Sequence, residues 1–193
     1  EVEPGLIEDL LLGCAQPAGE QGYNLARPVT LLAGLHQAAG TTINRYCASS
    51  LQALRMGFHA IRSGEADALM VAGVEAVSRY AKGKADGMDD TKNPRFSEAS
   101  EGLPDVYMPM GETAEQVADR FAITRQEMDA YAAESQRRAV AAVQAGLFAR
   151  ELTAVPQPDG THFAQDECPR PGTTVERLAG LKPVFREQGR VTA

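Results

Sequence analysis

The sequence contains no apolar run that approaches the roughly 20 residues needed to cross a bilayer as a helix, so we expect no membrane span. It is also short of positive charge: it has 19 Lys and Arg but 26 Asp and Glu, which gives a formal net charge of −7. This balance argues against a nucleic-acid-binding surface. Internal repeats and low-complexity segments are absent as well. With 44% hydrophobic and 23% charged residues, the composition is that of an ordinary globular protein.

Cysteine is scarce, odd in number and widely spaced: the chain has only Cys14, Cys47 and Cys168. This pattern argues against a disulfide framework, and no pair has the CxxC spacing of a metal site. Free thiols suit a reducing compartment, so we expect a cytoplasmic protein without a metal centre.

The first part of the chain reads as alternating strands and helices. Apolar or β-branched runs predict strands over 7–15, 41–46 and 67–74. Helical spacing predicts helices over 24–35, with Asn24 as its N-cap, and over 49–63. In the second helix the apolar stripe consists of Leu51, Leu54, Phe58 and Ile61. This order predicts an α/β fold with a parallel sheet and crossover helices.

The composition changes near residue 78, where we place a domain boundary. Residues 78–105 are rich in Lys, Asp, Gly, Asn and Pro, which is typical of a functional loop or an insertion. Helices are then predicted over 113–121 and 124–145, the second with a capping box formed by Thr124 and Glu127 and a stop at Gly146. A strand end and turn over 155–161 and a short helix over 175–181 follow.

Cys47 lies where the second predicted strand turns into the 49–63 helix. Unpaired N–H groups and the positive end of a helix favour a thiolate at such a position. The small residues Ala48, Ser49 and Ser50 leave room for a substrate carbonyl, and their N–H groups could stabilise an oxyanion. A free cysteine is also often a small buried hydrophobe, and placement alone leaves both interpretations open. Cys14 is predicted to be core, and Cys168, in a Pro-rich loop, to be incidental.

Five segments, in order, resemble thiolases. The segment 42–54 is similar to the thiolase segment around the acyl-accepting cysteine. Four more segments resemble the family's glycine–glutamate turn, the start of its loop-domain helices, its Ser-Gln motif and the stretch before its Gly-Asn turn. They are AGVEAVS (72–78), MGETAEQVA (110–118), SQRRA (135–139) and LKPVF with GRVTA (181–193).

The resemblance implies a layered fold built from two βαβαβαββ halves, with a helix-rich loop domain inserted into the first. Residues 1–78 then form a partial N-terminal α/β domain, whose first strand we expect before Glu1. Residues 79–193 form the loop domain, with the start of a returning core strand at its end. The chain is thus expected to be one half of a longer protein.

The resemblance also implies acyl-CoA C-acyltransferase activity. The acyl group is carried as a thioester on Cys47 and passed to CoA, in thiolysis of a 3-ketoacyl-CoA, or to acetyl-CoA, in condensation. Coenzyme A is then a substrate, and no cofactor is expected. Thiolases work in lipid metabolism, including fatty-acid β-oxidation, as homodimers or homotetramers, which are the assemblies we expect here.

Four residues take site roles from the resemblance. Cys47 is the nucleophile, whereas Leu103, Met110 and Arg170 contact the coenzyme. The arginine fork suits the ADP part, because a guanidinium pairs with phosphate and stacks on adenine. Without the resemblance, Met110 fits a core position and Arg170 a solvated surface charge equally well. Two neighbouring positions also bear on function: Pro109 matches degradative members, and Arg177 replaces a serine that contacts CoA in the family.

Other groups that the family needs are not found in the sequence. The histidine that activates the cysteine, an oxyanion-site asparagine and a second cysteine belong to the C-terminal half, beyond residue 193. His36, His59 and His162 match none of them. Two alternatives therefore remain beside the enzyme: a non-catalytic thiolase-like scaffold subunit, and a cysteine hydrolase that uses Cys47 with His36 or His162.

Overall fold

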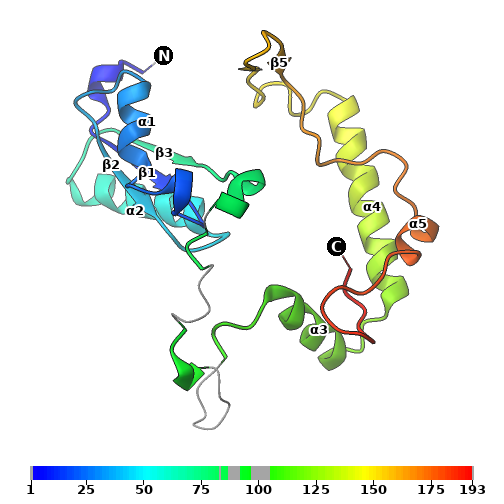
Figure 1. Ribbon diagram of the computed structural model, residues 1–193. Coiled ribbons are helices and arrows are strands. Elements are labelled where there is room, and N and C mark those ends of the chain that lie inside the picture. The colour runs from blue at the N-terminus through cyan, green and yellow to red at the C-terminus, as the bar shows by residue number, and fades with distance from the viewer. Residues whose placement is uncertain (1, 83, 87–91, 97–104, 193) are drawn as a thin grey trace. The chain divides into compact units, whose positions relative to one another are not determined.

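The computed structural model describes residues 2–82, 84–86, 92–96 and 105–192 (Figure 1). Its contacts divide the chain into two compact units, Glu1–Asn93 (unit 1) and Pro94–Ala193 (unit 2), which are described one at a time. This division falls later in the chain than the domain boundary predicted near residue 78, which remains a prediction.

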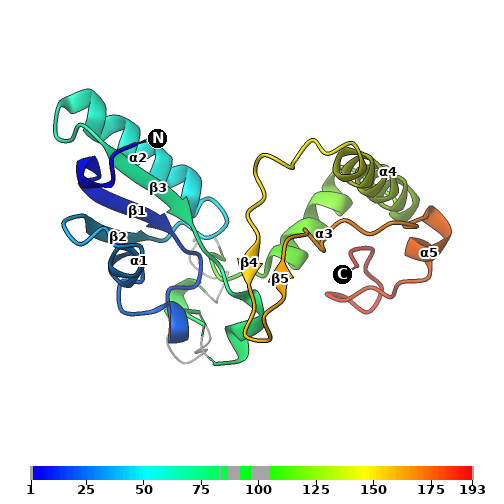
Figure 2. The same ribbon diagram turned by 90° about the horizontal axis from the view of Figure 1, so that it is seen from above.

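Unit 1 is built on a three-stranded parallel sheet, as the sequence predicts. Its strands are β1 (Asp9–Gly13), β2 (Ala39–Ile43) and β3 (Leu69–Gly73), in the order β2-β1-β3. The central strand pairs with both neighbours in parallel, so all three strands run in the same direction (Figure 2). Their carboxyl ends therefore meet at one edge of the sheet.

Helices α1 (Ala26–Leu32) and α2 (Ser49–Ser63) pack on opposite faces of this sheet. Side chains alternate along a strand. Leu10 and Leu12 therefore pack against the α1 side, while Leu11 packs with Ala53 of α2. The predicted helix 49–63 is confirmed at both ends, and Gly64 stops it with φ +75°. Both helices thus connect parallel strands, as the alternating pattern requires.

The face of α2 that packs on the sheet is made of small residues. Ser49, Ala53 and Gly57 are buried, and a Cβ added at Gly57 would lie 3.3 Å from Cγ2 of Val71. The large apolar stripe identified in the sequence is 44–69% exposed instead. Small residues let the helix approach the sheet closely and turn the stripe away from it.

Asn24 is not the N-cap of α1, contrary to the prediction. The helix begins one residue further on, with Leu25 at the N-cap and no side-chain capping bond. Asn24 adopts a left-handed backbone with φ +53°, and its amide binds β2 instead. Its Oδ1 accepts the N–H of Thr42 at 2.9 Å, and its Nδ2 donates to the carbonyl of Gly40 at 2.7 Å. The side chain therefore fastens the α1 entry to the neighbouring strand.

Short 3-10 helices lie before, between and after these elements, and the last of them begins unit 2. They are η1 (Pro4–Leu6), η2 (Gly19–Gln21), η3 (Val77–Lys82) and η5 (Pro94–Phe96).

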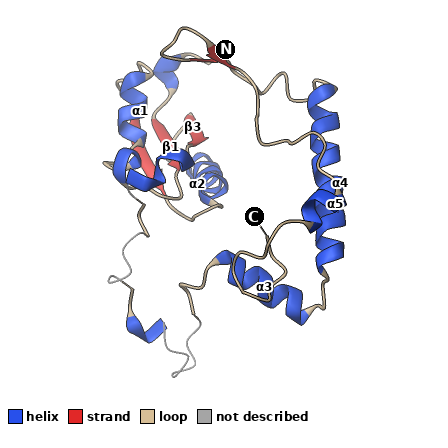
Figure 3. Ribbon diagram, turned by 45° about the vertical axis from the view of Figure 1, so that its right-hand side comes forward, coloured by secondary structure: helices blue, strands red, loops and turns tan. Residues whose placement is uncertain are grey.

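The regular structure of unit 2 consists mainly of helices joined by long loops, as expected for the second part of the chain (Figure 3). Its elements are α3 (Met110–Arg120), α4 (Arg125–Gln144), the antiparallel pair β4 (Val155–Pro156) and β5 (His162–Phe163), and α5 (Val175–Ala179).

The helix ends of unit 2 follow the sequence signals closely. The capping box is confirmed: Oγ1 of Thr124 accepts the N–H of Glu127, and the Glu127 carboxylate accepts the N–H of Thr124. Helix α3 begins at Met110, earlier than the predicted residue 113, because Gly111 weakens the helical signal there.

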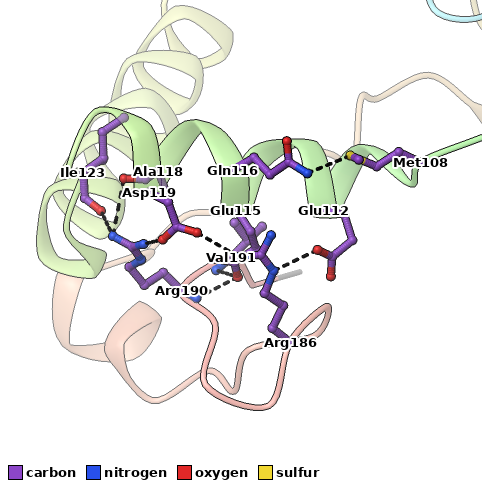
Figure 4. Close-up of polar contacts among 10 residues, drawn as sticks. All are labelled: Met108, Glu112, Glu115, Gln116, Ala118, Asp119, Ile123, Arg186, Arg190 and Val191. Atoms are coloured by element: carbon purple, nitrogen blue, oxygen red, sulfur yellow. Dashed lines mark hydrogen bonds and ion pairs between the residues drawn. The ribbon is translucent and has the colours of Figure 1, made fainter. Parts of the chain in front are cut away.

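A buried carboxylate fastens the end of the chain to α3 (Figure 4). Glu115 is 1% exposed, and its Oε1 accepts the N–H groups of Arg190 and Val191, each at 2.7 Å. A Cβ on Gly189 would lie 2.3 Å from this oxygen, so only glycine fits beside it. The bond partners are far apart in the sequence, and the contact makes residues 186–191 part of the helical unit.

Arginines complete this attachment. Arg186 donates from Nε to Glu112 at 2.8 Å and from Nη1 to Asp119 at 2.8 Å, as Figure 4 shows for the first of these contacts. Arg190 donates to the carbonyl of Ile123 at 2.8 Å and also pairs with Asp119. We call these two arginines, with Glu112, Glu115 and Asp119, the α3 clamp.

A second arginine contact ties α5 to α4. Arg125 donates from Nε to both oxygens of the buried Asp129, at 2.8 and 2.9 Å. Its remaining nitrogens donate to the carbonyls of Leu178 and Leu181, at the end of α5. Charged hydrogen bonds of Arg125 therefore help to join α4 to the end of α5.

Candidate active site

Cys47 lies exposed in the turn between β2 and α2, the position predicted for it. Tyr46, immediately before it, has φ +47°, a left-handed conformation that is costly for a bulky residue. Local hydrogen bonds hold this conformation. Oδ1 of Asn44 accepts the Tyr46 N–H at 2.8 Å, and Oγ of Ser49 donates to the Tyr46 carbonyl at 2.6 Å. Strain of this kind clusters at functional sites, and here it presents the thiol to solvent.

Two glycines bring the start of α2 close to the sheet. Gly13 and Gly73 are paired neighbours at the carboxyl ends of β1 and β3. A Cβ on Gly13 would lie 2.5 Å from the Ser50 nitrogen, and one on Gly73 would lie 2.1 Å from Oγ of Ser50. The Cys47 turn thus follows the carboxyl edge of a parallel sheet, where ligands of open α/β folds bind.

The first turn of α2, which begins two residues after Cys47, contains N–H groups that have no backbone partner in the described part of the chain. No backbone acceptor for the N–H groups of Ser50 and Leu51 is found among the described residues, as is usual at a helix start. Such groups and the helix dipole stabilise negative charge. The turn therefore combines an accessible nucleophile with donors suited to an oxyanion.

No base is bound to the thiol within the described part of the chain, where no side chain hydrogen-bonds to the Cys47 sulfur. His59 lies twelve residues further on, which is about 18 Å along a helix at 1.5 Å per residue. Among the described contacts of unit 1, His36 forms no hydrogen bond with Cys47, and His162 belongs to unit 2. The cysteine-hydrolase hypothesis therefore gains no support from these contacts.

A polar cluster that the sequence analysis did not single out supports the same edge of the sheet. Glu75, just after β3, accepts the N–H of Ala15 and an Nε2 proton of Gln21, each at 2.7 Å. Partial burial disfavours its ionisation, but hydrogen bonds from Gln21 and Ala15 outweigh burial and lower the pKa of the Glu75 carboxyl. Glu75 belongs to the segment AGVEAVS, but its partners Ala15 and Gln21 are 60 and 54 positions away, so no local pattern marks the contact.

The other two cysteines differ from Cys47. Cys14 is 1% exposed, which confirms that it belongs to the core, and burial raises the pKa of its thiol. Cys168 is exposed in a loop of unit 2. Only Cys47 of the three combines exposure with a helix start.

Met110 begins α3 and is 76% exposed, so it is no core residue. The start of its helix rests on an aromatic ring: a Cβ on Gly111 would lie 2.3 Å from the ring of Phe185. The α3 clamp holds the same helix one turn later. Leu103, the neighbouring prediction, lies outside the described residues.

Arg170 is exposed in the loop between β5 and α5, and its N–H donates to Oε1 of Gln136 on α4 at 2.7 Å. The side chain lines a groove of about 370 Å³ between α4 and residues 170–173. Arg177 folds over the same loop, since its Nη1 donates to the carbonyl of Gly172 at 3.0 Å. Met110 and Arg170 thus both belong to unit 2, whereas Cys47 belongs to unit 1.

A larger open groove of about 1120 Å³ lies in unit 1 between α2 and the sheet, and residues such as Leu11, Met56 and His59 line it. Cys47 does not line this groove. Within the described ranges, no three His, Cys, Asp or Glu side chains gather as metal ligands, and no helix is both long and apolar enough to cross a membrane.

The chain matches the family model described as "Thiolase, N-terminal domain" over residues 1–193. It is 41% identical to the 3-oxoadipyl-CoA/3-oxo-5,6-dehydrosuberyl-CoA thiolase of Escherichia coli K12, over 97% of this chain and 50% of that protein. It is 37% identical to a 3-ketoacyl-CoA thiolase of Bacillus subtilis, over 98% of this chain and 50% of that protein. The chain therefore spans about half the length of these relatives.

Solved structures agree. The acetyl-CoA acetyltransferase of Bacillus anthracis superposes with a TM-score of 0.80 at 31% identity, over 99% of this chain and 50% of that one. The dimeric peroxisomal thiolase of Saccharomyces cerevisiae gives a TM-score of 0.86 at 30% identity, over 97% and 48%. The fold is thus the α/β fold of thiolases, and the chain belongs to the thiolase family, whose N-terminal domain it matches.

Proposed function

We propose that the protein is a thiolase-type C-acyltransferase that carries its acyl group on Cys47. The observation that carries this proposal is the exposed thiol at a strained strand-to-helix turn, two residues before the start of α2. A scaffold subunit needs none of these features. Membership of the thiolase family supports the same reaction class.

In the degradative direction, the Cys47 thiolate attacks the 3-keto carbon of a 3-ketoacyl-CoA. A carbon–sulfur bond forms, the carbon–carbon bond to C2 breaks, and the departing acetyl-CoA carbanion takes up a proton. The thiolate of a second CoA then attacks the thioester, and Cys47 is released as a thiolate. In condensation, acetyl-CoA acylates Cys47 and releases CoA, and the carbanion of a second acetyl-CoA attacks the thioester. The first turn of α2 stabilises the oxyanion in both directions.

Coenzyme A is proposed to bind unit 2 through Leu103, Met110 and Arg170. The exposure of Met110 and the groove beside Arg170 support these roles. The coenzyme acts as a substrate, and no further cofactor is part of the proposal. Pro109, before α3, matches the degradative members, so we propose fatty-acid β-oxidation as the setting.

The groups that move protons, a histidine and a second cysteine, are proposed to lie in a second half outside these 193 residues. The exposed stripe on α2 supports such a partner surface, because large apolar patches usually mark interfaces. A homodimer or homotetramer is proposed for the whole protein, and the yeast relative is described as dimeric. Three free thiols support a reducing, cytoplasmic location.

Intact-mass spectrometry of the full-length protein after incubation with 3-ketoacyl-CoA tests the proposal. We expect one acyl adduct, mapped to Cys47, and its loss in Cys47→Ala. Cys168→Ala removes the other exposed thiol and should leave the adduct unchanged. An unmodified Cys47, or a Cys47→Ala variant with full activity, would overturn the mechanism and favour the scaffold alternative.

A further inference from the structure

We propose that Asn44 and Ser49 are positioning residues for acyl transfer, because together they hold the turn that presents the Cys47 thiol. The inference rests on the proposed function, since it takes Cys47 as the acyl carrier. It deepens that proposal by assigning two further side chains of the same site, which act on the rate through the backbone of the turn.

The turn needs support, because its backbone is strained directly before the nucleophile. Tyr46 has φ +47°, a left-handed conformation that is unfavourable for a bulky residue. Such a conformation persists only where surrounding contacts determine it. If those contacts were lost, Tyr46 would relax, and Cys47 would move with its neighbour.

Ser49 bonds to both residues that precede Cys47. Its Oγ accepts the N–H of Arg45 at 2.9 Å and donates to the carbonyl of Tyr46 at 2.6 Å. Ser49 is 3% exposed, so water cannot readily take over either bond. Because Ser49 is the first residue of α2, its hydroxyl attaches the turn to the helix.

Asn44 restrains the same turn from the strand side. It follows β2 directly, and its Oδ1 accepts the N–H of Tyr46 at 2.8 Å. A short amide side chain that binds the backbone two residues further on fixes a local turn of this kind. Tyr46 is therefore held at its N–H by the strand end and at its carbonyl by the helix start.

The loss of one hydroxyl or amide would loosen this turn without dismantling it. Two backbone bonds remain: the N–H of Ala48 donates to the carbonyl of Arg45 at 3.1 Å, and the N–H of Ser49 donates to that of Tyr46 at 3.0 Å. Asn44 is exposed as well, so its truncation removes no core contact. Variants at both positions should therefore fold.

A loosened turn should slow acyl transfer more than simple thiol chemistry. Acyl transfer needs the sulfur, the carbonyl carbon and the oxyanion donors in line, and a misplacement of about 1 Å costs about 100-fold in rate. Alkylation by iodoacetamide has no such requirement, because this small reagent approaches an exposed thiol freely. The two rates together therefore separate positioning from accessibility.

The chain offers a matched control for each residue. Oγ of Ser63 donates to the carbonyl of Ala60 at 3.0 Å, at the opposite end of α2. Oδ1 of Asp166 accepts the N–H of Cys168 at 2.9 Å, beside the other exposed thiol. Ser63→Ala and Asp166→Ala therefore remove the same kinds of bond away from Cys47.

Steady-state kinetics of the full-length protein with a 3-ketoacyl-CoA and CoA test the inference. We expect kcat to fall about thirtyfold in Ser49→Ala and about tenfold in Asn44→Ala, while KM changes less than about twofold. Asn44→Asp keeps the acceptor oxygen and should recover most of the rate, measured on the plateau of the pH profile so that the added charge does not limit it. Both control variants should retain the wild-type kcat.

Alkylation rates of Cys47 and denaturation curves complete the test. We expect Ser49→Ala and Asn44→Ala to be alkylated within about twofold of the wild-type rate and to remain folded at the assay temperature. A wild-type kcat in both variants, or a fall in alkylation rate that matches the fall in kcat, would overturn the inference. An Asn44→Asp variant as slow as Asn44→Ala, or controls as slow as the variants, would overturn it too.

The acyl adduct on Cys47, measured in the same proteins, separates this inference from the proposed function. A wild type that is acylated on Cys47, with variants that turn over at the wild-type rate, refutes the positioning role alone. A wild type that is never acylated refutes the mechanism itself.

Discussion

The two units of the chain are stabilised by different interactions. Unit 1 buries apolar side chains on both faces of its sheet, whereas Ala118 is the single buried hydrophobic residue among those described in unit 2. The most buried charged residues, Glu115 and Asp129, both belong to unit 2 and bind backbone N–H groups or an arginine. The hydrophobic effect therefore dominates in unit 1, and charge-assisted hydrogen bonds dominate in unit 2.

This difference matches the parts proposed for the two units. The proposed nucleophile, Cys47, lies at the edge of the apolar sheet, where close packing limits movement of the turn. The proposed coenzyme contacts lie on the unit held by arginines, whose long side chains adapt to an anionic ligand. Truncating apolar side chains should therefore damage unit 1 most, and changes to carboxylates or their neighbours should damage unit 2.

The largest effect is expected for Leu10→Ala. Leu10 is 1% exposed in the middle of the sheet, so its truncation should leave a cavity and cost about 3 kcal/mol of stability. Peptide-resolved hydrogen exchange should place the loss of protection in residues 1–93. Leu32→Ala, at a side chain that is 89% exposed, is the control and should change little. Equal losses in both variants would contradict an apolar core in unit 1.

Gly111→Ala, in unit 2, is expected to have the second-largest effect on stability. The new methyl group would collide with the Phe185 ring, so overpacking should cost about 2 kcal/mol. Chemical denaturation measures the loss, and the double variant with Phe185→Ala should recover part of it. Gly180→Ala is the control, because a Cβ there lies 3.4 Å from the nearest atom. A strictly additive double variant would show that the ring is not the cause.

Glu115→Gln should cost about 1–2 kcal/mol, since a neutral amide accepts the two N–H groups less strongly than a carboxylate does. Hydrogen exchange should rise at Arg190 and Val191 while unit 1 is unaffected. Glu151→Gln, at an exposed carboxylate of the same unit, is the control. Unchanged exchange at Arg190 would show that the clamp adds nothing to stability.

The smallest effect is a pH dependence in unit 1. The pKa of Glu75 is lowered from its ordinary value of 4.5, so the folded unit binds fewer protons than the unfolded chain below that pH. Its contribution should be fully present above pH 4.5 and lost as pH falls towards the lowered pKa. Glu75→Gln should flatten this part of the stability curve, measured by denaturation at several pH values. An unchanged curve would refute the role of Glu75.

Most of the fold could be predicted because its signals are local. The α2 boundaries and the Thr124 capping box each depend on a few neighbouring residues, and the parallel direction of the three strands follows from the alternation of strands and helices. The role of Asn24 could not be predicted, since its partners lie on another strand. The packing face of α2 could not be predicted either. The helix has both a stripe of large apolar residues and a face of small residues such as Gly57, and the small face packs on the sheet.

The site divides in the same way. The position of Cys47 followed from the adjoining strand and helix, and the thiolase resemblance supplied its role. The contact between Gln136 and the Arg170 backbone could not be predicted, because it joins residues that are 34 positions apart. The α3 clamp could not be predicted either, because Glu115 and Arg190 are 75 positions apart and hydrophobic periodicity describes only neighbouring residues.

Because Cys14 is buried, its reaction with a thiol reagent would report local opening of the sheet in unit 1. An alkylating reagent should modify Cys47 and Cys168 at once, whereas Cys14 can react only when β1 separates from its neighbours. The slow third modification, followed by mass spectrometry, would therefore measure the free energy of opening the central strand. Bound coenzyme should slow the reaction of Cys47 and leave that of Cys14 almost unchanged. One reagent would thus measure two things: coenzyme binding, from the rate at Cys47, and opening of the sheet, from the rate at Cys14.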